Sequence, residues 1–176
     1  DVTVLLITFF LTVIFDLTVA IEVGLVIACV LFMKRVMETT EISVITDEID
    51  PNKESDIAVH EENLMIPKGI EVYEINGPYF FGIATKFEET MTQLGDRPKV
   101  RIIRMRKVPF IDSTGIHNLT TLCEMSQKEK TTVILSGVNE NVHNVLEKAG
   151  FYELLGKENI CPNINVALER AKSLVK

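Results

Sequence analysis

An almost wholly apolar segment, Asp1 to Met33, constrains this chain more than any other feature of its sequence. Beyond its first residue the segment carries only two carboxylates, Asp16 and Glu22. A single helix over this length would be about 48 Å long, whereas the hydrocarbon core of a bilayer is about 30 Å thick. Such a helix would also place both carboxylates near the bilayer centre. We therefore expect two antiparallel helices, a transmembrane hairpin.

The expected hairpin has arms at Val2–Phe15 and Val19–Met33, and Asp16 or Thr18 in the turn can cap the second arm. Each arm would be about 21–23 Å long, which is too short to cross a bilayer alone. The second arm also carries a stripe of small residues at every fourth position, Ala20, Gly24 and Ala28. Because such stripes favour close helix packing in lipid, the arms are interpreted as part of a larger membrane domain in a longer protein.

The basic pair Lys34 and Arg35 directly follows the second arm. Cytoplasmic flanks of membrane helices carry an excess of such residues, so residues 34–176 are expected in the cytoplasm. Carboxylates inside a membrane are candidates for an ion pathway, which makes Asp16 and Glu22 candidate site residues. We favour the simpler interpretation that Asp16 is a residue of the turn and Glu22 a residue of the first turn of the second arm. A buried hairpin of a soluble protein is a less favoured alternative.

An acidic segment, residues 36–67, separates the apolar part from the rest of the chain. It holds nine acidic residues and only Lys53 as a base, although the whole chain has a net charge of only −7. We expect a cytoplasmic linker here, with a short strand at Ile42–Ile45. The chain as a whole offers no broad basic surface, which argues against nucleic acid as a partner.

Residues 68–176 alternate between strand-like and helix-like patterns, which is typical of an α/β domain with a largely parallel sheet. Strands are expected at Ile70–Ile75, Val100–Met105 and Thr132–Leu135. Helices are expected around residues 83–94, 116–123, 142–149 and 167–175. Asn139 is the expected cap of the third helix, and Asn163 or Asn165 the cap of the last.

The tetrapeptide Asp112-Ser113-Thr114-Gly115 lies between the second expected strand and the helix that follows it. Ligands of parallel sheets gather beyond the carboxyl ends of strands, so this motif loop is a candidate site. Its two hydroxyls can cap the helix, or the helix N-terminus can hold an anion. Ser113 and His117 are one helical turn apart, but no Gly-x-Ser-x-Gly elbow accompanies them. We therefore expect no enzyme.

A second candidate site is a cluster of four cations, Arg101, Arg104, Arg106 and Lys107. The cluster can bind an anion, a nucleotide phosphate, an acidic protein or the acidic segment of the same chain. It can equally be a set of solvated side chains at a strand end. Both interpretations stay open. No phosphate-binding glycine loop supports a nucleotide.

Three further residue types carry less information. The histidines at positions 60 and 143 have no companions at metal-ligand spacing, so neither metal nor cofactor is expected. The three cysteines are isolated, which argues against a disulfide or a zinc site and favours a reducing compartment. Four phenylalanines could form a partner surface but are expected mainly in the core: Phe80, Phe81, Phe110 and Phe151.

Three runs of the chain are VYEINGPYFFG (72–82), FIDSTG (110–115) and LSGVN (135–139). These runs resemble the STAS domain, found in bacterial anti-sigma-factor antagonists and in the cytoplasmic tails of SulP anion permeases. In the apolar part, FDLTVAIEVG (15–24) and LFMKR (31–35) resemble the last two transmembrane helices of SulP permeases. The expected organisation is a membrane hairpin at 1–35, a linker at 36–67 and a STAS domain at 68–176.

The resemblance implies the C-terminal part of an ion-coupled anion carrier of the inner membrane, with sulfate as the usual substrate. This part would anchor, dimerise and regulate the rest of the membrane domain, with a cytoplasmic protein or a nucleotide as an additional partner. In the soluble antagonists a kinase phosphorylates the serine before the motif glycine. The resemblance places Thr114 at that position, with Ser113 beside it. The alternative is a free-standing antagonist switched at these residues.

Overall fold

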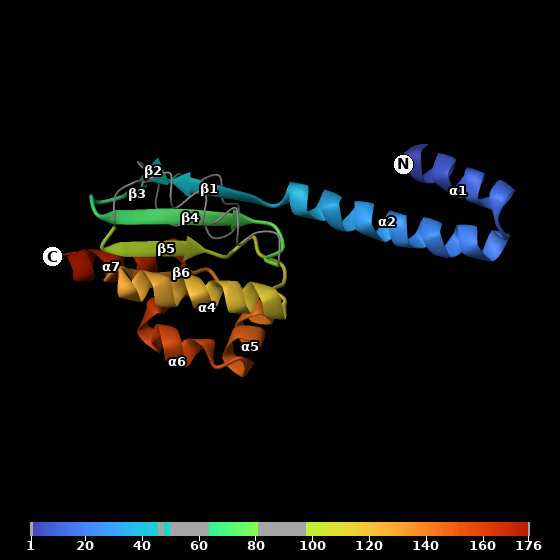
Figure 1. Ribbon diagram of the computed structural model, residues 1–176. Coiled ribbons are helices and arrows are strands. Elements are labelled where there is room, and N and C mark those ends of the chain that lie inside the picture. Colours follow the sequence, from blue (N-terminus) through green and yellow to red (C-terminus); the bar gives the residue numbers. More distant parts are fainter. Residues whose placement is uncertain (1, 46–47, 50–63, 81–97, 176) are drawn as a thin grey trace. The chain divides into compact units, whose positions relative to one another are not determined.

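The computed structural model describes residues 2–45, 48–49, 64–80 and 98–175 (Figure 1). The chain divides into two compact units, residues 1–39 and 40–176, which are considered separately. The helix expected around residues 83–94 lies outside the described residues, as do Phe81 and His60.

The first unit is a helical hairpin of α1 (Val2–Ile14) and α2 (Leu17–Thr39). The second helix begins at Leu17, so Asp16, and not Thr18, is the residue directly before it. The Asp16 carboxylate accepts a hydrogen bond from the Leu17 N–H at 2.7 Å. The expected length of that helix was wrong. It continues through Lys34 and Arg35 to Thr39 and is about 35 Å long. Within the described residues, Leu17–Val36 is the one helix long and apolar enough to cross a membrane.

The two helices approach closely at Gly24, which is buried against Thr8. A β-carbon on Gly24 would lie only 2.8 Å from Thr8 Oγ1. Ala20 is also fully buried, whereas Ala28 is exposed, so two of the three small residues form the contact. Most large apolar side chains of this unit face outward, among them Leu5, Phe9 and Leu25. Such a surface needs lipid or further helices around it.

The second unit is built on a five-stranded sheet in the order β1-β4-β5-β6-β7 (Figure 1). The strands are β1 (Glu41–Ile45), β4 (Ile70–Asn76), β5 (Val100–Arg104), β6 (Thr132–Ser136) and β7 (Ile160–Cys161). Only β1 runs antiparallel to its neighbour, and the other three pairings are parallel. A separate two-stranded pair joins β2 (Glu48–Ile49) to β3 (Leu64–Met65). The expected α/β fold is confirmed.

The short strand expected at Ile42–Ile45 is present, but it does not belong to a separate linker. It pairs along its whole length with β4, from Glu41 opposite Asn76 to Ile45 opposite Val72. The alternation of Ile42 and Val44 explains this, because both pack against the core. Part of the acidic segment is therefore an edge strand of the sheet.

Helices cover the two faces of the sheet with separate cores. On one face lie α4 (Ser113–Lys128), α5 (Glu140–Lys148) and α6 (Phe151–Leu155), which bury Tyr73, Ile103 and Leu135 among others. On the other face α7 (Ile164–Val175) buries Val72, Ile102 and Ile134. The period-2 alternation of the strands produces this division.

The predicted caps are mostly confirmed. The side-chain Oδ1 of Asn139 accepts a hydrogen bond from the Val142 N–H at 2.9 Å at the start of α5. Asn163, rather than Asn165, accepts from the Val166 N–H at 3.0 Å at the start of α7. The sequence reasoning missed α6, the 3-10 turn η2 (Lys157–Asn159) and β7, because helices of three to five residues are too short for the helical repeat and a strand of two residues is too short for alternation.

Candidate functional site

The motif loop at residues 112–115 lies where the chain enters α4, as expected, but its cap differs from the expected one. The Asp112 carboxylate accepts a hydrogen bond from the Gly115 N–H at 2.6 Å, and Asp112 has extended backbone geometry. Ser113 and Thr114 are already in the first helical turn, and both are exposed. The expectation that their hydroxyls cap the helix was therefore wrong. A carboxylate at the cap position satisfies the third N–H of the helix.

The glycine of the motif is required by a close backbone contact. A β-carbon on Gly115 would collide with the carbonyl oxygen of Tyr79 and would lie 2.9 Å from Ile111 Cγ1. Tyr79 also forms a parallel bridge with Ile111. The start of α4 is thus packed against the segment that follows β4. The exposed Ser113 and Thr114 lie in this packed first turn.

An exposed aromatic side chain adjoins this loop. Phe110 is 54% exposed, although it was expected in the core, and its ring stacks on the buried Phe80 ring with centroids 6.3 Å apart. The Phe110 carbonyl oxygen accepts a hydrogen bond from the Tyr79 N–H at 3.1 Å, which ties this residue to the segment after β4. Phe151, in contrast, is buried as expected. Phe110, Ser113 and Thr114 together define the motif surface.

The motif surface does not carry hydrolase chemistry. His117 is exposed, and the Asp112 carboxylate is engaged in the helix cap, so it does not orient the imidazole. Within the described residues, no three histidine, cysteine, aspartate or glutamate side chains are placed to hold a metal ion. His143 lies against the Tyr152 ring and shares a hydrogen bond with its hydroxyl.

The expected cation cluster is divided between the interior and the surface. Arg101 and Arg104 are 5% and 3% exposed, so the interpretations of both as anion-docking or solvated residues were wrong. Arg101 Nε lies 3.8 Å from Glu71 Oε2, and Arg104 Nη1 lies 3.6 Å from Glu74 Oε1. Each pair is directly opposed across the parallel β4–β5 pairing. These arginines form ion pairs that join β4 to β5 within the sheet.

Further contacts fix the first of these ion pairs. Arg101 Nη1 donates to Ser126 Oγ of α4 at 2.8 Å, and the Tyr73 hydroxyl donates to Glu71 Oε2 at 2.8 Å. Burial, together with the neighbouring Glu71 carboxylate, raises the pKa of Tyr73 well above its usual value. A sequence signal for both pairs existed, because glutamates at 71 and 74 and arginines at 101 and 104 share a three-residue spacing.

The other two cations of the cluster, Arg106 and Lys107, are exposed. Lys107 Nζ lies 3.4 Å from Glu74 Oε2, so this carboxylate sits between Arg104 and Lys107. In the hairpin unit, Asp16 lies at the turn, as expected, and Glu22 is exposed on α2.

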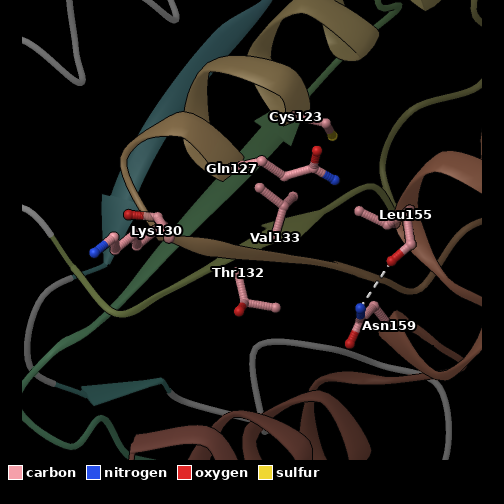
Figure 2. A pocket seen from close by; sticks show the side chains of 8 residues that line it. Cys123, Gln127, Lys130, Thr132, Val133, Leu155 and Asn159 are labelled. Atoms are coloured by element: carbon pink, nitrogen blue, oxygen red, sulfur yellow. Dashed lines mark hydrogen bonds between the residues drawn. The ribbon is translucent and has the colours of Figure 1, made fainter.

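A cavity of about 270 Å³ lies at the other end of α4, between its last turns, the start of β6 and the α6–η2 connection (Figure 2). Cys123, Gln127, Lys130 and Asn159 are among the residues that line it. Burial raises the pKa of the Cys123 thiol to about 12, so it stays protonated and is a poor nucleophile. The Asn159 amide is engaged with Leu155 and Arg170. The cavity brings no reactive groups together.

Comparison with known proteins matches residues 63–167 to the STAS domain model. The chain is 28% identical over 160 residues to the Bacillus subtilis protein YvdB, whose name assigns it to sulfate transport. A sulfate transporter family protein from Wolinella succinogenes is 44% identical, with a TM-score of 0.61 over 64% of this chain and 92% of that one. The SulP transporter STAS domain from Vibrio cholerae is 35% identical, with a TM-score of 0.57 over 63% of this chain and 87% of that one.

The likeness to one solved structure extends over the hairpin as well. The murine Solute Carrier 26 family member A9 anion transporter matches 97% of this chain with a TM-score of 0.72. At 17% identity this is a likeness of fold alone, and it covers 28% of that chain. The chain likewise spans about a quarter of the length of the curated relatives it matches, 28% and 25%.

Proposed function

Since the chain belongs to the STAS-domain family, and its STAS domain is that of SulP-type sulfate transporters, we propose that it is the regulatory and assembly portion of a membrane anion carrier. The observation that carries the proposal is the direct junction of a lipid-compatible hairpin and a STAS domain. Helix α2 ends at Thr39 and the first strand of the sheet begins at Glu41. One residue, Thr40, therefore separates the hairpin from the first strand of the sheet along the chain.

The proposed location and partners follow from the hairpin. The outward apolar side chains of α1 and α2 need cover, and the rest of the carrier's membrane domain supplies it. Lys34 and Arg35 near the end of α2 favour a cytoplasmic STAS domain at residues 40–176, attached to a multi-pass protein of the inner membrane. We further propose a homodimer, with sulfate as the substrate, in keeping with the names of the relatives. No enzymatic role is proposed.

The motif surface is the proposed regulatory contact. Asp112 and Gly115 fix the start of α4, while Ser113, Thr114 and Phe110 remain exposed for a cytoplasmic regulatory protein or a nucleotide. Phosphate on Thr114 would add about −1.5 to −2 charges at a helix N-terminus, where the helix dipole stabilises negative charge. It would also repel the adjacent Asp112 carboxylate and so change what the surface binds.

Measurement of sulfate uptake by the full-length carrier tests this proposal. The Ser113→Ala/Thr114→Ala double variant is compared with wild type and with Thr121→Ala, a control on the same helix whose hydroxyl bonds the His117 carbonyl. We expect the motif variant to change the uptake rate by about threefold or more, which corresponds to about 0.65 kcal/mol or more, at unchanged membrane abundance. Uptake equal to wild type in both variants would contradict a regulatory motif surface.

The alternative is a free-standing antagonist of an anti-sigma factor, switched at Ser113 or Thr114. Solved antagonists share the fold, for instance one from Mycobacterium paratuberculosis with a TM-score of 0.52 at 17% identity. The exposed apolar surface of α1 and α2 argues against this alternative, because soluble proteins rarely expose so large an apolar surface to water.

A further inference from the structure

The first residue after α2 is fixed inside the STAS domain. Thr40 is fully buried, and its hydroxyl donates to the Pro78 carbonyl oxygen at 3.5 Å. A β-carbon on Gly77 would lie 2.7 Å from Thr40 Oγ1 and 3.2 Å from Thr40 Cα. Gly77 also has a φ of +121°, which side chains rarely adopt. The turn after β4 therefore fits directly against the backbone of Thr40.

The same turn contacts the motif loop on its other side. The Gly77 N–H donates to the Lys107 carbonyl oxygen at 3.3 Å, and the Tyr79 N–H donates to that of Phe110 at 3.1 Å. Tyr79 also forms the bridge with Ile111, and its carbonyl oxygen touches the site where Gly115 lacks a side chain. Residues 76–80, which we term the connecting turn, thus lie between Thr40 and the motif loop.

The backbone of the connecting turn takes part in each of these contacts, so a displacement is passed to its main chain and not only to side chains. Two glycines, Gly77 and Gly115, permit the approach at the two ends of the connecting turn. Close-packed interiors transmit small displacements because neighbouring groups have no voids to move into. A shift of the motif loop must therefore move the connecting turn, and a shift of the connecting turn must move Thr40.

We propose that the connecting turn couples the motif surface to Thr40, the residue that follows α2 in the chain. The inference deepens the proposed function, since it assigns the route within the STAS unit along which a partner or phosphate at the motif surface would act. Coupling between sites requires evidence that a change at one alters the other through the residues between them. A double-mutant cycle provides such evidence.

Hydrogen exchange of the full chain in detergent micelles measures the coupling at residues 36–45. Asp112→Ala removes the α4 cap, and we expect it to speed exchange at these residues by about threefold or more, the scale of coupling between packed sites. In the Thr40→Ala background the same change should have an effect below about 1.5-fold. Thr40→Ser keeps the hydroxyl and should restore the response.

The matched control is Thr131→Ala. Thr131 is also buried, and its hydroxyl also donates to a proline carbonyl oxygen, that of Pro98 at 2.7 Å, before β6 begins. The response to Asp112→Ala should persist in this background. If Asp112→Ala prevents folding, Phe110→Ala, which removes an exposed ring stacked on Phe80, perturbs the loop instead.

An equal response in the Thr40→Ala, Thr131→Ala and unmodified backgrounds, or no response in any of them, would overturn the proposed coupling. The readout is local exchange, not transport, so it separates this inference from the proposed function. Uptake insensitive to the motif variants with coupled exchange would reject only the regulatory role. Sensitive uptake without coupled exchange would reject only the route through Thr40.

Discussion

Arg101 and Glu71 form an ion pair in which the two side chains are only 6% and 17% exposed. Removal of one member of a buried pair leaves the other charged in a poorly solvated place, which costs more than the pair itself contributes. The Tyr73 hydroxyl and the Ser126 hydroxyl complete the group, and the Arg101 guanidinium lies 5.7 Å from the centre of the Tyr73 ring. At the scale of single residues, these four side chains tie β4, β5 and α4 together.

Arg101→Met should lower the free energy of unfolding by about 2–3 kcal/mol, slightly below the usual range for a buried pair because Glu71 keeps some contact with water. Urea unfolding of the chain in detergent micelles measures the change. Lys128→Ala, which removes an exposed cation at the end of α4, is the control and should change stability by less than about 0.5 kcal/mol. Equal effects of the two substitutions would contradict a structural role for Arg101.

The Cys123 thiol predicts a dependence of stability on pH. Its pKa is about 12 in the folded state against 9.0 for the unperturbed group, chiefly because of burial. Between these values the unfolded chain releases the proton while the folded chain retains it. The free energy of unfolding therefore falls as the pH rises above 9, by up to about 1.4 kcal/mol per pH unit from this group.

Comparison of wild type with Cys123→Ala isolates this contribution, because all other titrating groups are shared. Urea unfolding at pH 8 and pH 10 should show a smaller loss of stability for the variant, by about 1 kcal/mol. An identical loss in both proteins would mean that the thiol ionises as readily in the folded state as in the unfolded one.

At the scale of elements, the entry into α4 depends on a single glycine. Gly115→Ala would drive a β-carbon into the Tyr79 carbonyl oxygen and Ile111, so the helix start must move away from the segment after β4. We expect a loss of about 1–3 kcal/mol in the free energy of unfolding, as for overpacked interiors. Thr114→Ala, the adjacent exposed residue, should change it by less than about 0.5 kcal/mol. A Gly115→Ala protein as stable as Thr114→Ala would refute the close contact.

Elements with clear periodicity could be predicted from the sequence, and elements governed by their neighbours could not. The strands at β4, β5 and β6 and the helices α5 and α7 match the alternation and spacing of their apolar residues. The C-terminal end of α2 was placed too early because Lys34 and Arg35 were taken to end the helix, whereas they are good helix formers. The place of β1 in the sheet depends on its pairing with β4, which no local pattern shows.

The candidate site was predictable in position but not in detail. The strand-to-helix junction at residues 112–115 follows from the local sequence, yet competition between Asp112, Ser113 and Thr114 for the cap depends on which residue adopts extended geometry. The burial of Arg101 and Arg104 depends on glutamates some 30 residues away. Long-range pairing decides whether a charge at a strand is exposed, and a single sequence gives only the shared spacing as a sign of it.

At the scale of the whole molecule, the two units of the chain differ in whether their large apolar side chains are exposed or buried. The hairpin of residues 2–39 exposes its apolar side chains, whereas the STAS domain buries its own in two cores. This difference in exposure fits a hairpin surrounded by a membrane domain and a STAS domain surrounded by water. We therefore propose that this STAS domain works as part of a membrane carrier, and not as a free-standing switch.

The most direct test is the mass and location of the native polypeptide in the host, detected with an antibody against residues 98–176. Our account predicts a species that stays in the membrane fraction after alkaline washing and is much larger than the 19.8 kDa of this chain, because further membrane helices of the proposed carrier cover the outward apolar side chains of α1 and α2. A water-soluble species of 19.8 kDa would contradict the account and would favour the antagonist instead.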